Sequence, residues 1–184
     1  SATSYSLFNV LPVFCVLVAV IVSLLALKTN SWRLNSALVP SLFGVGLIFT
    51  GMLGYAVQMI SSADLVDTVF EEGVFVYIGY GAVLVAIGAI SHWSHELRGT
   101  SLPAGVIMGL GAAGFIATVF ASLPYYMAGF TNQAAKSVTD FDNGGPHALW
   151  NSLAGVGHAL MAVVVVYFVV FVLRPTRSVA ATPS

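Results

Sequence analysis

Residues 68–93 read TVFEEGVFVYIGYGAVLVAIGAISHW, and this stretch decides the fold class. After Glu71 and Glu72, no charged residue follows until Glu96. An α-helix rises about 1.5 Å per residue, so an apolar run of about 20 residues crosses the hydrocarbon core of a bilayer. Residues 70–91 are therefore predicted to form a transmembrane helix.

The whole chain has the composition of a membrane protein. Of its 184 residues, six are Lys or Arg and seven are Asp or Glu, whereas 58% are hydrophobic. A soluble domain has about a quarter of its residues charged. The net charge of −1 and the lack of a basic stripe exclude nucleic acid as a partner. The composition predicts an all-α integral membrane protein that contacts the lipid bilayer.

Four further apolar stretches have the length of a membrane span. Helices are expected because lipid cannot satisfy open sheet edges and barrel strands have only about ten residues. The first stretch lacks a basic leader region, so we expect a span and not a cleaved signal. We predict one membrane domain over 1–184, a bundle of five transmembrane helices at about residues 7–27, 37–60, 70–91, 103–130 and 147–173.

The basic residues lie almost entirely on one side of these predicted spans. Cytoplasmic connections carry an excess of Lys and Arg, so the N-terminus is expected outside and the C-terminus in the cytoplasm. The residues on the cytoplasmic side are Lys28, Arg33, Arg98, Arg174 and Arg177, and the exception is Lys136.

Sequence motifs for nucleotide binding, zinc proteolysis or a nucleophilic serine are absent. The single cysteine, Cys15, lies within the first predicted span and is expected to be a small buried apolar residue. The spacing Gly105-x3-Gly109, with Gly111 and Gly114, predicts a close approach of 103–130 to a neighbouring helix.

Several motifs follow one another in an order typical of one membrane protein family. Thr68, the tetrapeptide GVFV at 73–76, Trp93 and Gly99 stand at the spacing of a family pattern T-x4-G-H-F-H, an apolar run, a Trp and a Gly. Over 41–173 the chain resembles the carboxy-terminal part of subunit I of haem–copper terminal oxidases, helices eight to twelve. The resemblance implies an oxidase-like core in a bacterial or archaeal cytoplasmic membrane.

The main departure from the family is that Val74 and Val76 stand where the resemblance places the axial histidines of two haems. Valine offers iron no lone pair, so neither haem can be held in that way. The family's copper-binding histidines lie on helices before the matched ones. We predict a non-catalytic, haem-less relative without a cofactor, acting as a structural or accessory subunit of a respiratory or redox membrane complex. Lipid or side chains such as Phe75, Tyr77 and Tyr80 should fill the space beside the valines.

Other functions stay open. The chain could be one half of a split oxidase core, although the same valines argue against that. It could also be a small membrane protein that binds a quinone, haem or metal near His158. Finally, His92, His95 and Glu96 are expected to be solvated, but their spacing would also allow a metal on one helical face.

Three residues are the candidate binding residues. His158 is near the middle of the last span, where an imidazole without a partner costs several kcal/mol. We predict that it faces the bundle and bonds a carbonyl or hydroxyl of an adjoining helix; the alternative is a ligand site, with Met161 one turn away. Glu71 and Glu72 suit the positive end of the helix dipole. Alternatively, one of these carboxylates orients a quinone, a metal or a partner's lysine.

Overall fold

The computed structural model describes residues 14–15, 17–18, 20–22, 35–60, 63–131, 133 and 146–173. In that part of the chain, four long α-helices are apolar enough to cross a membrane. They are α2 (Leu38–Gln58), α3 (Phe70–Arg98), α4 (Ala104–Phe130) and α5 (Pro146–Leu173). Most of the predicted span at 7–27 lies outside the described residues, and those described between 14 and 22 are helical. The protein is an all-helical integral membrane protein.

The end of α3 differs from the prediction. The apolar run ends at Ser91, but the helix continues through polar residues to Arg98. It stops at Gly99, whose φ of 70° is left-handed and whose N–H donates to the carbonyl of His95 at 2.7 Å. Hydropathy marks only the part of a helix that lies in lipid, whereas a glycine in this conformation ends the helix itself. The other three helices begin and end within two residues of the predicted bounds.

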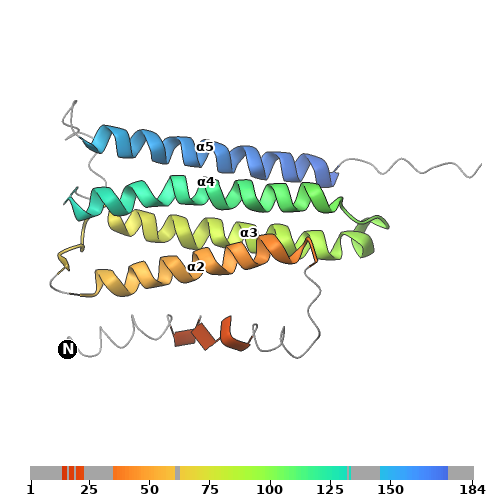
Figure 1. Ribbon diagram of the computed structural model, residues 1–184, viewed down its shortest axis with the longest axis horizontal. Coiled ribbons are helices and arrows are strands. Elements are labelled where there is room, and N and C mark those ends of the chain that lie inside the picture. The colour runs from red at the N-terminus through yellow and green to blue at the C-terminus, as the bar shows by residue number, and fades with distance from the viewer. Residues whose placement is uncertain are drawn as a thin grey trace, which may run out of the picture.

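Consecutive helices pack side by side in antiparallel pairs (Figure 1). Helix α2 packs against α3, α3 against α4, and α4 against α5, while α2 also contacts α4. The short connection between α3 and α4, residues 99–103, favours this arrangement because it returns the chain directly along its neighbour. Helix α4 therefore contacts each of the other three long helices.

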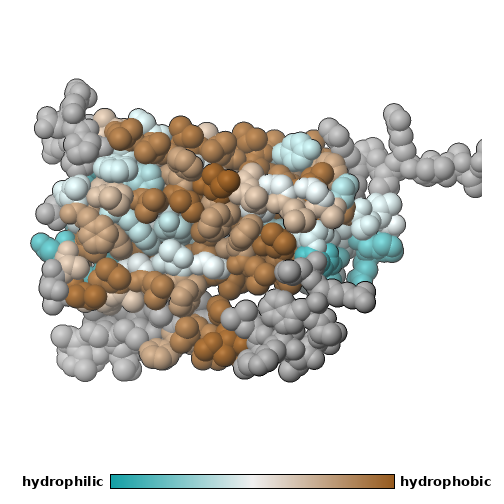
Figure 2. Space-filling view, viewed as in Figure 1, coloured by the Kyte–Doolittle hydropathy of each residue, from teal (hydrophilic) through white to brown (hydrophobic). Residues whose placement is uncertain are grey.

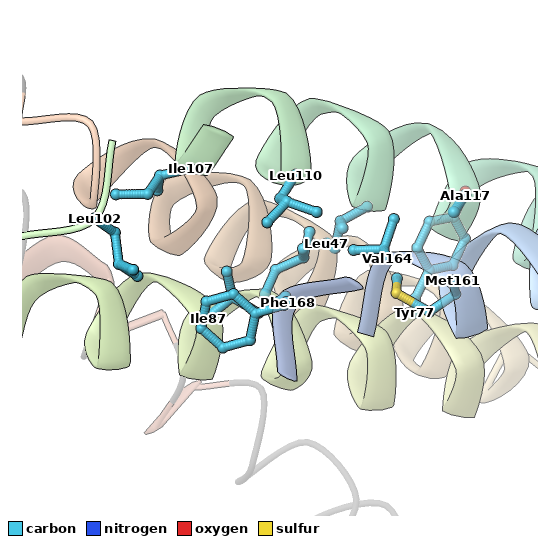
Figure 3. Close-up of a cluster of buried hydrophobic side chains, with 11 residues drawn as sticks. Leu47, Tyr77, Ile87, Leu102, Ile107, Leu110, Ala117, Met161, Val164 and Phe168 are labelled. Carbon is cyan, nitrogen blue, oxygen red and sulfur yellow. The ribbon is translucent and has the colours of Figure 1, made fainter. Parts of the chain in front are cut away.

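The main core lies where the four helices meet (Figure 3). Each helix contributes buried side chains to it, for example Leu47 from α2, Tyr77 from α3, Ala117 from α4 and Met161 from α5. Such packing matters in a bilayer because lipid tails are as apolar as the core, so helix association depends on close contact.

Glycines set the closest helix contacts. A Cβ on Gly44 of α2 would meet the carbonyl oxygen of Gly81 on α3, and a Cβ on Gly81 would meet that of Gly44. The predicted small-residue face of α4 is correct only in part. Gly111 and Gly114 face Pro40 and Leu84, but Gly105 and Gly109 have nothing within 4 Å of an added Cβ. The spacing alone could not show which side of the helix meets a neighbour.

The surface has the distribution expected of a protein in lipid. Figure 2 shows hydrophobic residues over the middle of the bundle and hydrophilic residues gathered at its two ends. Large apolar side chains are exposed along every long helix, including Leu53, Phe75, Phe120 and Val163. Cys15 is exposed as well, and not buried as expected.

Candidate functional site

His158 lies between two tyrosines that come from two other helices. Its Nδ1 is 2.6 Å from the hydroxyl of Tyr80 on α3. Its Nε2 is 3.5 Å from the hydroxyl of Tyr125 on α4, a longer contact. We call Tyr80, Tyr125 and His158 the His158 cluster. The predicted hydrogen bond from His158 to a hydroxyl on an adjoining helix is confirmed.

The tautomer of His158 sets the direction of this chain of contacts. In a neutral imidazole one ring nitrogen donates and the other accepts. If Nδ1 accepts from Tyr80, then Nε2–H points a donor toward Tyr125; in the other tautomer both directions reverse. The cluster can therefore present a donor or an acceptor to a polar group without gaining or losing a proton.

Met161 does not share a site with His158. It is only 2% exposed and belongs to the main core, whereas the imidazole is half-buried. Within the described ranges, no three His, Cys, Asp or Glu side chains are grouped so that they could hold a metal ion. His92, His95 and Glu96 are all exposed at the end of α3, as their interpretation as solvated residues expects, and the metal alternative at these residues stays a prediction.

Glu71 and Glu72 lie in the first turn of α3, as the dipole argument requires, and both are half-buried. Their backbone N–H groups bond to the carbonyls of Thr68 and Val69. The Glu72 carboxylate also interacts electrostatically with Tyr125. This interaction relates Glu72 to one member of the His158 cluster.

The two tyrosines of the cluster were not predicted as site residues. The pairing of Tyr80 with His158 could have been inferred from their depths in the membrane, because α3 and α5 start at the same end of the bundle (Figure 1). Tyr80 is ten residues into α3 and His158 is twelve residues into α5, which places them at depths of about 15 and 18 Å. Matching polar residues by depth would have paired them.

The space beside Val74 is filled by protein side chains. Val74 is 0% exposed and packs in a small cluster with Leu65 and Phe70, against which Tyr126 of α4 also packs. The rings of Phe70 and Tyr126 stack with their centroids 4.2 Å apart. On the opposite side, a Cβ on Gly54 of α2 would meet the Tyr126 hydroxyl.

The residues expected to fill this space take different positions. Tyr77 is buried, and its ring centroid is 5.3 Å from that of Tyr126. Tyr80 instead bonds His158. Phe75 is 60% exposed on the outer side of α3, so its predicted role as a filler is wrong. Helix geometry explains the difference, because adjacent residues point about 100° apart and Val74 takes the inward position.

The His158 cluster is the arrangement of polar side chains with the clearest chemical capacity. Hydroxyl and imidazole groups can hydrogen-bond a carbonyl oxygen, and they can pass a proton along the line from Tyr80 to Tyr125. The imidazole is half-buried, and its two nitrogens face the two tyrosine hydroxyls. No protein-family model matches this sequence, and no curated protein matches it either.

Proposed function

We propose that this protein is a haem-less relative of haem–copper oxidase subunit I that acts as a structural or accessory subunit of a membrane redox complex. The proposal starts from the order and spacing of Thr68, the GVFV stretch at 73–76, Trp93 and Gly99. In addition, the valine side chains at positions 74 and 76 cannot ligate iron.

The observation that carries the proposal is the packing around Val74. A haem-binding chain needs a slot the size of a porphyrin beside its axial ligand. Here Val74 has no exposed surface, and Phe70 and Tyr126 stack in the adjoining space. Dense side-chain packing of this kind contributes dispersion contacts that a slot would forfeit. The valines and the filled space therefore support the same conclusion.

The outer surface of α5 supports a role alongside other membrane subunits. Val163, Val166 and Val170 are exposed at helical spacing and form a continuous apolar side of α5. β-Branched valines hold a single side-chain rotamer in a helix, so such a surface loses little entropy when another helix packs on it. This side can contact lipid or an apolar helix of a partner equally well.

Co-purification tests the proposed function. The tagged protein is extracted from its native membranes in a mild detergent, crosslinked, and analysed for bound proteins by mass spectrometry. We expect redox subunits at a fixed ratio to this chain. A matched variant, Val163→Lys with Val166→Lys, places charges on the α5 surface and should reduce their recovery, whereas Leu53→Lys on α2 should not. Recovery of the chain alone, even after crosslinking, would contradict the proposal.

A second candidate function is the binding of a quinone at the His158 cluster. The observation that favours it is the 3.5 Å separation between His158 Nε2 and the Tyr125 hydroxyl. The hydrogen bond between these two groups is therefore weak. A quinone carbonyl could accept a hydrogen bond from either group.

Quinone extraction followed by chromatography tests this candidate. The purified protein should retain a quinone, and Tyr125→Phe should lose most of it. Tyr167→Phe is the matched control, because Tyr167 is exposed on α5 and stacks with Phe171, away from the His158 cluster's ring contacts. Equal quinone content in all three proteins would rule the candidate out and leave the first proposal standing.

A further inference from the structure

A cavity of about 440 Å³ lies at the end of the bundle opposite Glu72, where α2 begins, α3 ends and α4 begins. Its wall contains six polar residues from these three places: Asn35, Ser36, Ser91, His92, Ser94 and Ser101. None of the described residues in the wall is acidic. The cavity therefore offers hydroxyl, amide and imidazole groups, which can all donate hydrogen bonds.

Hydrogen bonds hold the wall of the cavity in shape. Ser94 donates its hydroxyl to the carbonyl of Ser91 at 2.7 Å and accepts the N–H of Leu102 at 3.3 Å, which fixes the turn between α3 and α4. At the start of α2, the Asn35 side-chain oxygen accepts the Ser36 hydroxyl at 3.2 Å. The same oxygen also lies 3.4 Å from the backbone nitrogen of Ala37, whose N–H donates to it.

One buried donor in the wall has no partner, and helix α4 begins beside it. The hydroxyl of Ser91, a residue only 5% exposed, has no hydrogen-bond partner among the described residues. The N–H group of Ala104, which lines the cavity, precedes the first intrahelical bonds of α4, in which Val106 and Ile107 donate to Pro103. The start of a helix of this length also carries a partial positive charge. The unpartnered hydroxyl and the helix start both favour an anion in the cavity.

We propose that this cavity binds a phosphate group. Phosphate supplies oxygen acceptors for His92, Ser101 and the first N–H groups of α4, and its charge suits the helix start. The apolar part of the wall, which includes Leu102 and Ile107, would contact the carbon chain of a lipid. The position at the end of the membrane-spanning helices is that of a phospholipid head group. The phosphate can come from such a lipid or from free phosphate in solution.

Thermal unfolding of the full chain in phosphate-free detergent tests this proposal. The probes are dihexanoyl phosphatidylglycerol, inorganic phosphate, and dihexanoylglycerol, which lacks a phosphate. We expect the phosphate-bearing lipid to raise the Tm and dihexanoylglycerol to leave it unchanged. If inorganic phosphate raises the Tm equally at equal concentration, the site binds free phosphate; if only the lipid does, it binds a head group.

A matched pair of variants separates the cavity from general surface charge. Ser101→Asp places a negative charge in the wall, whereas Thr100→Asp places the same charge on the exposed neighbour outside it. We expect Ser101→Asp to raise the probe concentration that gives half of the maximal Tm increase by about tenfold, because it weakens binding. Thr100→Asp should change it less than about twofold, since exposed charges are screened. No rise in the Tm with either phosphate probe, or equal weakening by both variants, would overturn the proposal.

Discussion

The hydroxyl of Tyr80 on α3 lies 2.6 Å from Nδ1 of His158 on α5, although α4 packs between these two helices. This bond joins the first half of the bundle to its last helix. It also satisfies an imidazole at a depth where no water is available. The relationship therefore explains why a polar residue stands in the middle of an otherwise apolar helix.

If this bond stabilises the bundle, Tyr80→Phe and His158→Gln should each lower the free energy of unfolding. Their double-mutant cycle should give a coupling of about 0.5–1.5 kcal/mol, as for other hydrogen bonds between membrane helices. Unfolding in bicelles measures all four proteins, with Tyr167→Phe as the control for loss of a tyrosine hydroxyl. A coupling of zero would show that the two side chains do not bond, and would favour a ligand role for His158.

Tyr126 should behave as an apolar filler. Its ring packs beside Val74, but its buried hydroxyl has no hydrogen-bond partner among the described residues. Tyr126→Phe removes a donor that is costly to bury, so the Tm should stay the same or rise. Tyr126→Ala should cost about 3–5 kcal/mol, because it empties the space beside Val74. A Tyr126→Phe protein as unstable as Tyr126→Ala would show that the hydroxyl, and not the ring, is important.

Two glycines of α2 should respond to alanine in opposite ways. A Cβ at Gly44 would lie 2.8 Å from the backbone nitrogen of Val85 and would also meet the Gly81 carbonyl, so the helices must move apart. We expect a loss of about 1–3 kcal/mol for Gly44→Ala. Gly46 has nothing within 4 Å, and Gly46→Ala should gain up to about 1 kcal/mol from helix propensity. Thermal unfolding of the two variants, measured under the same conditions, tests this prediction. Equal stability would contradict the described packing of α2 on α3.

The positions of the membrane helices could be predicted from the sequence, because the lipid requires an apolar run that can be seen directly in the sequence. A span must be apolar for about 20 residues, and α2, α4 and α5 follow that rule closely. The end of α3 could not be found in this way. Most residues between Ser91 and Gly99 are polar yet helical, and the helix ends at Gly99, which has a left-handed backbone conformation.

The candidate site could be predicted only in part. His158 is conspicuous because it is an ionisable group in mid-span, and its need for a partner follows from desolvation. The identity of that partner depends on how α3 and α5 are rotated, and nearly uniform apolar helices give little indication of rotation. For the same reason, the sequence could not show that Tyr126 packs beside Val74 or that Phe75, expected to be a filler, is exposed.

Histidine introduced at the two valines should have unequal effects. Val74→His would place an imidazole in a filled space with no described partner, and should cost roughly 1–3 kcal/mol in addition to any steric strain. Val76 is only half-buried, so Val76→His should cost less. Thermal unfolding measures both variants. A Val74→His protein as stable as the wild type would mean that a space for an imidazole already exists beside α3.

The proposed function requires that this chain holds no haem. The most direct measurement is the visible absorption spectrum of the purified chain, with haem quantified by the pyridine haemochrome and divided by protein concentration. We expect no Soret band from the purified chain, and none from the variant that carries both Val74→His and Val76→His, because Phe70 and Tyr126 occupy the space. One haem per chain in the wild-type protein would contradict it.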